Sequence, residues 1–311
     1  MVAAPRLVGG FPQRVAVVAA GESHTACVTS LGEVFSWGCG RNGQLGHGDA
    51  SASFRSDPYR RLPVRTENLY APRRVEALAE QRVVGLDCGV DQSTAVVTAA
   101  GEVFVWGSVP TYQSTGYIDP TGISTRRAGV GSRHYVRHVS TPERVVLPPD
   151  VKMRRISCGG HHFAAVDAGG RLYTWGDNEN GRLGHGTVET APPTPYWDGR
   201  VVVDEEAPRM VAALAGQRVA MVSCGLRGTA VVTEQGQLWA WGFCSLRVHH
   251  DCALPFRVTG KLPGGEGGVV REVSCSIQHT VVVMASGEVC TFGDGDYGKL
   301  GRRPTEQVVT F

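Results

Sequence analysis

The segment EVFSWG at residues 33–38 returns four more times along this chain of 311 residues, always as a short apolar stretch that ends in Gly. Its copies are EVFVWG (102–107), RLYTWG (171–176), QLWAWG (237–242) and EVCTFG (288–293). Side chains alternate between the two faces of a strand. Val34 and Ser36 therefore point one way, while Phe35 and Trp37 point the other. Both faces are apolar or small, which predicts a strand that is covered on both sides.

Two further blocks recur in a fixed order before each copy. One block is VAAGESHTACV (18–28), LDCGVDQSTAVV (86–97), ISCGGHHFAAV (156–166), VSCGLRGTAVV (222–232) and VSCSIQHTVVV (273–283). The other block centres on a proline, at Pro5, Pro72, Pro142, Pro208 and Pro255, and a sixth copy opens at Pro304. A unit of three or four strands cannot bury both of its faces alone, so each unit must pack against its neighbours.

We therefore predict an all-β fold, a β-propeller built from five repeats of about 47–70 residues plus a terminal strand. It would be either a closed five-bladed ring or an open arc of a larger propeller. The single domain would comprise repeats at about 4–70, 71–140, 141–206, 207–253 and 254–303, with a closing strand at 304–311. The predicted structural residues of the repeat are Trp37, Trp106, Trp175, Trp241, Phe292, Gly21, Gly89, Gly159, Gly225, His24 and His279. We expect the Gly before each His block, and the Gly after each Trp, to occupy turns with positive φ.

These motifs resemble those of the regulator of chromosome condensation repeat family. The pattern apolar–small–small–Gly–x–x–His–Thr is met by Val18 to Thr25 and nearly met by Val273 to Thr280. The loop NGQLGHG (42–48) recurs as NGRLGHG (180–186) and, shortened, as YGKLG (297–301). The resemblance covers nearly the whole chain. It implies a propeller, usually of seven blades, in a family whose members have divergent roles.

The composition excludes several classes of protein. The 41 Gly and 17 Pro argue against long helices. A hydrophobic content of 42% with a net charge of +2 argues against a disordered chain, and gives no strong nucleic-acid signal. No apolar run approaches the ~18 residues of a membrane-spanning helix. Nine Cys without an N-x-[ST] sequon favour a reducing compartment, so we expect an intracellular protein of the cytoplasm or nucleus.

Motifs that are typical of nucleotide sites fall in the repeat loops. Residues 38–43 and 293–298 spell GxGxxG, which in a dinucleotide site opens a helix whose N-terminus meets the pyrophosphate. Here Gly-rich loop sequence follows instead. Residues 293–299 also fit GxxxxGK, but Leu300 stands where Mg²⁺ needs Ser or Thr. We therefore expect no cofactor.

One cluster has the ligand types of a zinc site: Cys244, His249, His250 and Cys252. Its spacing fits no common zinc module, and adjacent His residues on an extended chain point apart. An ordinary loop is therefore the stronger interpretation, and metal binding stays an open question.

No catalytic residues are expected. No Asp or Ser recurs at a fixed offset from the His of the repeat, as a catalytic triad would require. We expect these His residues to be half buried and to donate to a neighbouring carbonyl at a strand start. Light sensing, which the resemblance would associate with additional Trp in the His block, is not indicated. Those positions carry Glu22, Asp91, His161, Arg227 and Ile277.

Three loops interrupt the repeats, and loops on a rigid scaffold usually carry recognition residues. Residues 50–75 hold six Arg against two acidic residues, and residues 108–144 hold five against two. Residues 187–207 hold five acidic residues against one Arg. The predicted partner-binding residues in these loops are Arg60, Arg61, Arg73, Arg74, Arg126, Arg127, Arg133, Tyr196 and Trp197.

The function that we predict from the sequence is that of a non-catalytic scaffold, which binds a protein partner through its rim loops and does not enter a membrane. The resemblance implies one alternative, a guanine-nucleotide exchange factor for a small GTPase. In that case the insertion at 108–141 would be the wedge against the nucleotide site. The identity of the partner is left open.

Overall fold

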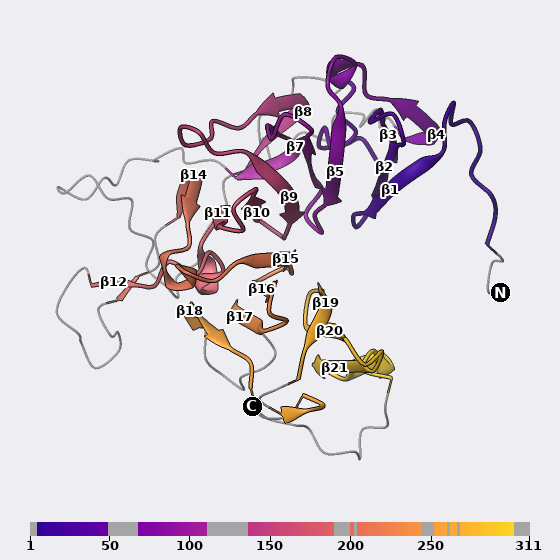
Figure 1. Cartoon of the computed structure of the whole chain (residues 1–311). Coiled ribbons are helices and arrows are strands. Elements are labelled where there is room, and N and C mark those ends of the chain that lie inside the picture. The colour runs from indigo at the N-terminus through magenta and orange to yellow at the C-terminus, as the bar shows by residue number, and fades with distance from the viewer. Residues whose placement is uncertain are drawn as a thin grey trace, which may run out of the picture.

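Five antiparallel sheets make up the molecule in the computed structural model, which describes residues 5–48, 68–110, 136–189, 200–201, 204–243, 252–259, 262–265 and 268–301 (Figure 1). Blade 1 contains β1 (Val15–Ala20), β2 (His24–Thr29), β3 (Val34–Gly38) and β4 (Leu69–Arg74). Blade 2 contains β5 (Val83–Cys88), β6 (Ser93–Thr98), β7 (Val103–Pro110) and β8 (Val136–Arg144). Blade 3 contains β9 (Met153–Cys158), β10 (His162–Asp167), β11 (Leu172–Gly176) and β14 (Glu205–Met210).

Blade 4 contains β15 (Val219–Cys224), β16 (Gly228–Thr233), β17 (Leu238–Gly242) and β18 (Cys252–Arg257). Blade 5 has three described strands, β19 (Val270–Cys275), β20 (His279–Met284) and β21 (Val289–Gly293). A small ribbon of β12 (Val188–Glu189) and β13 (Arg200–Val201) stands apart from the blades. The remaining elements are the short 3-10 turns Glu76–Leu78, Glu179–Gly181, Ala212–Leu214 and Asp296–Gly298. Within the described ranges, no helix has the length and apolar character needed to cross a bilayer.

The predicted five-bladed propeller is confirmed, and its blades are offset from the sequence repeats by one strand. From the second repeat to the fifth, the proline block that opens the repeat supplies the outermost strand of the preceding blade. Pro72 lies in β4, which pairs with β3, and Pro142 lies in β8, which pairs with β7. The closing strand expected at 304–311 lies outside the described residues.

The middle strands of the blades explain why the sequence repeats are apolar on both faces. Every residue of β6, β10 and β16 is buried, because each of these strands is covered by one blade on either side. The buried side chains form continuous clusters that pass from blade to blade. The blades are therefore held together mainly by burial of apolar surface between them.

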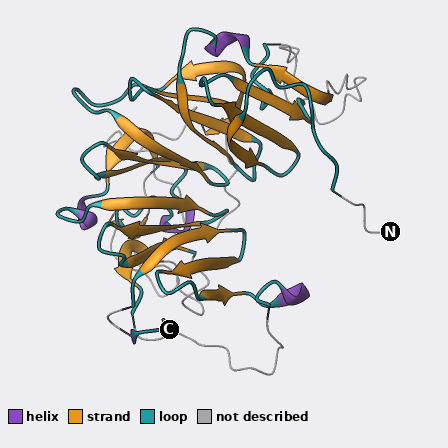
Figure 2. Ribbon diagram, turned by 45° about the vertical axis from the view of Figure 1, so that its right-hand side comes forward, coloured by secondary structure: helices purple, strands orange, loops and turns teal. Residues whose placement is uncertain are grey.

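The five blades follow one another along an arc (Figures 1 and 2). Extensive contacts between described strands join successive blades, and none joins blade 1 to blade 5. Blade 5 consequently presents a sheet face that is much less covered than its counterparts. Val283 is half buried there, whereas Val97 and Val166, at the same position of blades 2 and 3, are 0% exposed.

The N-terminal segment covers part of the outer face of blade 1. The ring of Phe11 lies 5.7 Å from the ring of Phe35, edge to face, and 6.0 Å from that of Trp37. On the inner strand of the same face, Val18 remains 67% exposed, while its counterpart Leu86 in blade 2 is 8% exposed. Phe11 thus covers the aromatic side chains of this face, as a preceding blade would, and leaves Val18 on the inner strand exposed.

The two kinds of repeat Gly have different roles. The Gly after each Trp has positive φ as predicted, for example 105° at Gly38 and 108° at Gly176. The prediction of positive φ for the Gly before each His block is wrong. A Cβ on Gly21, Gly89 or Gly159 would instead lie 3.0 Å or less from the backbone carbonyl of the next blade. These positions need Gly because two blades approach closely there.

Because the sheet face of blade 5 is less covered than that of blade 2, the same Val→Ala substitution should lower the free energy of unfolding by different amounts in the two blades. Val97→Ala should lower the free energy of unfolding by about 2 kcal/mol, because two methyl groups leave a fully buried site. Val283→Ala should cost less than about 1 kcal/mol, because that side chain keeps contact with water. Urea titration followed by tryptophan fluorescence measures both. Equal losses would mean that the face of blade 5 is covered in solution.

Candidate functional site

Most of the predicted partner-binding residues, Arg60, Arg61, Arg126, Arg127, Arg133, Tyr196 and Trp197, lie outside the described residues. The remaining two, Arg73 and Arg74, lie on β4, the outermost strand of blade 1. Arg73 is exposed, whereas Arg74 pairs with Glu33 at 3.2 Å and with Glu76 at 3.8 Å. The Arg74 side chain is therefore engaged within its own blade, and the role of both residues in binding stays a prediction.

The loop at 42–48 joins blade 1 to blade 2, and one of its backbone carbonyls accepts two hydrogen bonds from blade 2. The Gln44 oxygen accepts a hydrogen bond from the indole Nε1 of Trp106 at 2.8 Å and from the hydroxyl of Thr94 at 2.9 Å. Trp106 is 0% exposed. A Cβ on Gly46 would meet the indole ring at 2.9 Å, so Gly at this position lets the ring lie against the loop. Burial makes these bonds expensive to lose.

The first repeat His completes the same network. His24 Nε2 lies 2.9 Å from the Thr94 hydroxyl oxygen. Because that hydroxyl donates its proton to the Gln44 carbonyl, Nε2 must be the donor to Thr94. His24 is thus a neutral imidazole with its proton on Nε2. Its partner is a hydroxyl of the next blade, and the predicted partner, a neighbouring carbonyl, is wrong for this residue.

The network is repeated between blades 3 and 4. Trp241 Nε1 and the Thr229 hydroxyl both donate to the Arg182 carbonyl, each at 2.8 Å, and His162 Nε2 lies 2.8 Å from Thr229. Burial lowers the pKa of His24 from 6.5 to about 4 and holds the pKa of His162 well below its ordinary range. These His residues hold blades together as neutral groups.

The other two interfaces use different side chains. Between blades 2 and 3, Phe163 occupies the Thr position and stacks on Trp175 with ring centroids 5.4 Å apart. In blade 5, Phe292 takes the place of the Trp and is buried. In the loop that follows β21, a hydrogen bond within the blade is kept: the Thr291 hydroxyl donates to the Leu300 carbonyl at 2.7 Å.

Around the axis, the innermost strands are linked by side chains that accept backbone N–H groups. Asp87 of blade 2 accepts bonds from the Ser157 hydroxyl at 2.9 Å and the Cys158 N–H at 2.8 Å. Ser157 in turn accepts from the Cys224 N–H at 3.0 Å, and Ser223 accepts from the Cys275 N–H at 2.9 Å. An innermost strand has no neighbouring strand at its free edge, so these N–H groups need side-chain partners.

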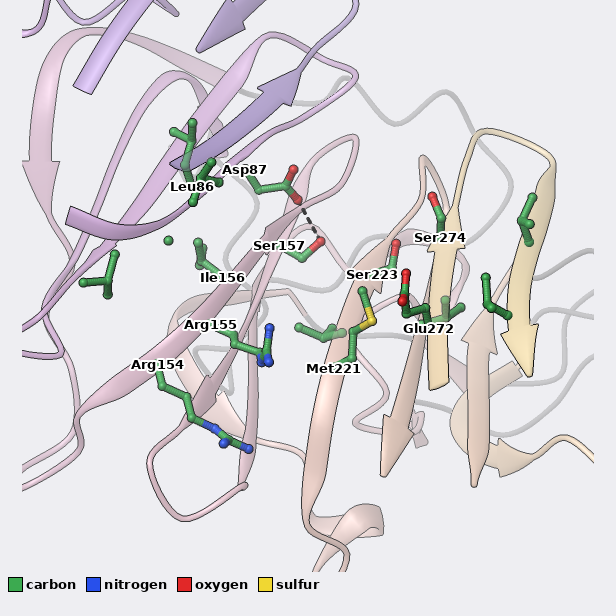
Figure 3. A pocket seen from close by; sticks show the side chains of 17 residues that line it. Leu86, Asp87, Arg154, Arg155, Ile156, Ser157, Met221, Ser223, Glu272 and Ser274 are labelled. Atoms are coloured by element: carbon green, nitrogen blue, oxygen red, sulfur yellow. Dashed lines mark hydrogen bonds between the residues drawn. The ribbon is translucent and has the colours of Figure 1, made fainter. Parts of the chain in front are cut away.

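A cavity of about 480 Å³ lies at this hub, where the innermost strands of all five blades line it (Figure 3). Leu86, Ile156 and Met221 contribute apolar wall, and Arg154 and Arg155 lie along one side. Burial raises the pKa of the Asp87 carboxyl, which faces the same space. No motif in the sequence singles out these residues.

A second cavity, of about 310 Å³, lies at the rim between blades 2 and 3. Its lining includes Val109 and Arg137 from the β7–β8 hairpin and Glu205 and Glu206 from β14. The hairpin and β14 flank the second and third of the charged loops found in the sequence. We call this cavity the rim groove.

No described cluster suits a metal ion, and burial makes several of the described thiols unreactive. Of the proposed zinc ligands only Cys252 lies in the described ranges, and no group of three potential ligands occurs within them. The eight described cysteines are free thiols. Burial raises the pKa of Cys27 and of Cys275 to about 11, which disfavours the nucleophilic thiolate.

The chain belongs to the RCC1-like domain family, whose model matches residues 2–310. It is 32% identical over 300 residues to the ultraviolet-B receptor UVR8 of Arabidopsis thaliana, covering 95% of this chain and 57% of that protein. It is 31% identical over 297 residues to the human E3 ubiquitin-protein ligase HERC2, covering 92% of this chain and 5% of the ligase. The chain thus spans little more than half of the first relative and a small part of the second.

Solved structures show the same fold. Human WBSCR16 superposes with a TM-score of 0.68 at 22% identity, over 94% of this chain and 66% of that one. Yeast RCC1 (Prp20), in its complex with Kap60, superposes with a TM-score of 0.65 at 20% identity, over 94% and 59%. The family identity inferred from the sequence motifs is therefore confirmed.

The buried neutral histidines predict a loss of stability in mild acid. Each binds a proton in the unfolded chain at about pH 6.5, whereas His24 in the folded chain binds one only near pH 4. Stability should therefore be full above pH 6.5 and should fall as the pH drops from 6.5 toward 4. The expected slope is about 1.4 kcal/mol per pH unit for each histidine.

Urea unfolding midpoints between pH 7.5 and pH 5 measure this dependence. His24→Gln keeps a donor for Thr94 but does not titrate, so the slope should become smaller in that variant. A slope that His24→Gln leaves unchanged would contradict the role assigned to this residue.

Proposed function

We propose that this chain is a non-catalytic scaffold that binds partner proteins at its rim. The observation that carries the proposal is the rim groove, at a place where the repeat pattern is interrupted. Between blades 1 and 2 the loop at 42–48 fills the equivalent space and bonds to β8, through the Gly48 N–H and the Ser140 carbonyl at 2.7 Å. In blade 2 a long insertion replaces that loop.

The side chains of the groove suit a protein partner. Val146 is 83% exposed at its edge, with Arg137 and Arg144 on the blade 2 side and Glu206 on the blade 3 side. Arg137 pairs with Glu143 at 2.5 Å, and Arg144 with Glu102 at 2.7 Å. Exposed pairs of this kind contribute little to stability and can exchange partners on binding. An exposed apolar group within a polar border is typical of protein interfaces.

Charge reversal at the rim tests the proposal. Partners captured from an extract by the wild-type chain should be lost by a variant with Arg60, Arg61, Arg126 and Arg127 changed to Glu, and by Arg137→Glu with Arg144→Glu. Quantitative mass spectrometry of the bound fractions measures both losses. Arg41→Glu is the matched control, because Arg41 is exposed and lies outside the charged loops and the lining of the rim groove. Equal capture by all forms would exclude the rim loops and the groove as the interface.

The alternative, nucleotide exchange on a small GTPase, is favoured by one finding. The chain superposes with a TM-score of 0.64, at 21% identity, on yeast Prp20p, a structure described together with its binding to Gsp1p and histones. The insertion at 108–141 would act as the wedge. Release of labelled GDP from a panel of small GTPases should accelerate if this alternative holds. Unchanged release across the panel would leave the scaffold as the function.

A further inference from the structure

The hub cavity has a mixed lining, in which apolar side chains such as Leu86 and Met221 stand beside two Arg and two acidic residues. Of its charged side chains, Asp87 is occupied by hydrogen bonds from blade 3, and Glu272 pairs with Arg271 at 3.1 Å. Arg154 donates to the Val219 carbonyl at 2.9 Å. Arg155 is exposed to the cavity, and no described residue forms an ion pair or hydrogen bond with its side chain (Figure 3).

Basic residues also recur where the innermost strands begin. In four successive blades the residue that precedes the innermost strand is Arg14, Arg82, Lys152 and Arg218. Each occupies the same place, because its carbonyl accepts the N–H of the turn after the second strand, from Ser30, Ala99, Ala168 and Glu234. All four side chains are exposed. The four basic residues therefore lie at the same end of the innermost strands, and later residues of these strands line the hub cavity.

Most of this charge has no partner among the residues that the structure describes. Arg218 pairs with Glu234 at 2.7 Å. No described residue forms an ion pair with Arg14, Arg82 or Lys152. Together with Arg155 they form what we call the hub arc: Arg14, Arg82, Lys152 and Arg155. Several like charges beside a low-dielectric cavity create a positive potential that attracts anionic groups.

We propose that the hub arc binds an acidic peptide segment of a partner protein, with an apolar side chain of that segment in the hub cavity. Carboxylates of the segment would pair with the hub arc, and the apolar side chain would contact Leu86, Ile156 and Met221. A nucleic-acid strand fits less well, because no aromatic side chain of the described ranges lines the cavity for base stacking. The site lies at the hub and is separate from the rim groove, so it does not depend on the function proposed above.

Fluorescence anisotropy with the full chain tests the proposal. The probe is a labelled peptide composed of Glu, Leu and Ser, compared with a peptide in which Lys replaces Glu and with labelled single-stranded RNA. The acidic peptide should bind, and the Lys peptide should not. Arg155→Glu should weaken binding about tenfold or more, and Lys152→Glu by a smaller factor. Added salt should also weaken binding, because the paired charges are exposed.

Two controls distinguish a loss of peptide binding at the hub from a loss of binding at the rim groove and from unfolding of the variant. Arg137→Glu, in the rim groove, should leave peptide binding unchanged even if it abolishes partner capture at the rim. Far-ultraviolet circular dichroism and a thermal melt establish that Arg155→Glu is folded, and Lys152→Glu, at an exposed position, gives a second test. Equal affinity of wild type and both variants for the acidic peptide would overturn the proposal. Tighter binding of RNA than of peptide would overturn it as well.

Discussion

The backbone carbonyls of Gln44 and Arg182 each accept two hydrogen bonds from the next blade, one from an indole and one from a hydroxyl. A repeat His then donates to that hydroxyl, so two donors share one carbonyl and the His extends the network back to the first blade. These groups are buried, and a buried polar group that loses its partner costs more than the bond itself contributes. The apolar faces could pack in more than one way, but this network allows a single placement of blade against blade. The loop NGxLGHG supplies both the acceptor and the Gly that admits the indole ring, which explains why its letters recur as a unit.

Much of the fold follows from the sequence, because every blade repeats the same alternation of side chains. The strand positions, the five units and the burial of Trp106 and Trp241 are predictable from periodicity alone. The role of Gly21, Gly89, Gly159 and Gly225 is not, because close approach of two blades depends on distances that no local pattern contains. The partner of His24 was missed for the same reason, since Thr94 lies 70 residues away. Two residues of the hub arc, Arg14 and Arg82, did have a signal. Gln-Arg-Val occurs at 13–15 and 81–83, and again at 217–219, each time just where an innermost strand begins.

The two ends of the arc differ from its internal interfaces. Blade 1 presents Thr25 and Trp37 at the positions of Thr94 and Trp106, and Phe11 covers part of that face. Blade 5 carries Ser276 where the other blades carry Gly, so its Cβ occupies space that the internal interfaces leave to a carbonyl of the following blade. The internal blades form a rigid frame, and it is the irregular places, the rim groove and the hub, that offer groups to a partner. This division is typical of propellers, in which a repeated core positions variable recognition surfaces.

A double-mutant cycle at the first interface tests this account most directly. Thr94→Val and Trp106→Phe each remove one donor to the Gln44 carbonyl, and the double variant leaves that carbonyl with neither. Because the two donors serve one acceptor, the free energies of unfolding should be non-additive by about 1 kcal/mol or more. The matched cycle at Thr25 and Trp37, on the outer face of blade 1, should be additive. Additivity at Thr94 and Trp106, equal to that at Thr25 and Trp37, would show that the shared carbonyl does not determine how the blades assemble.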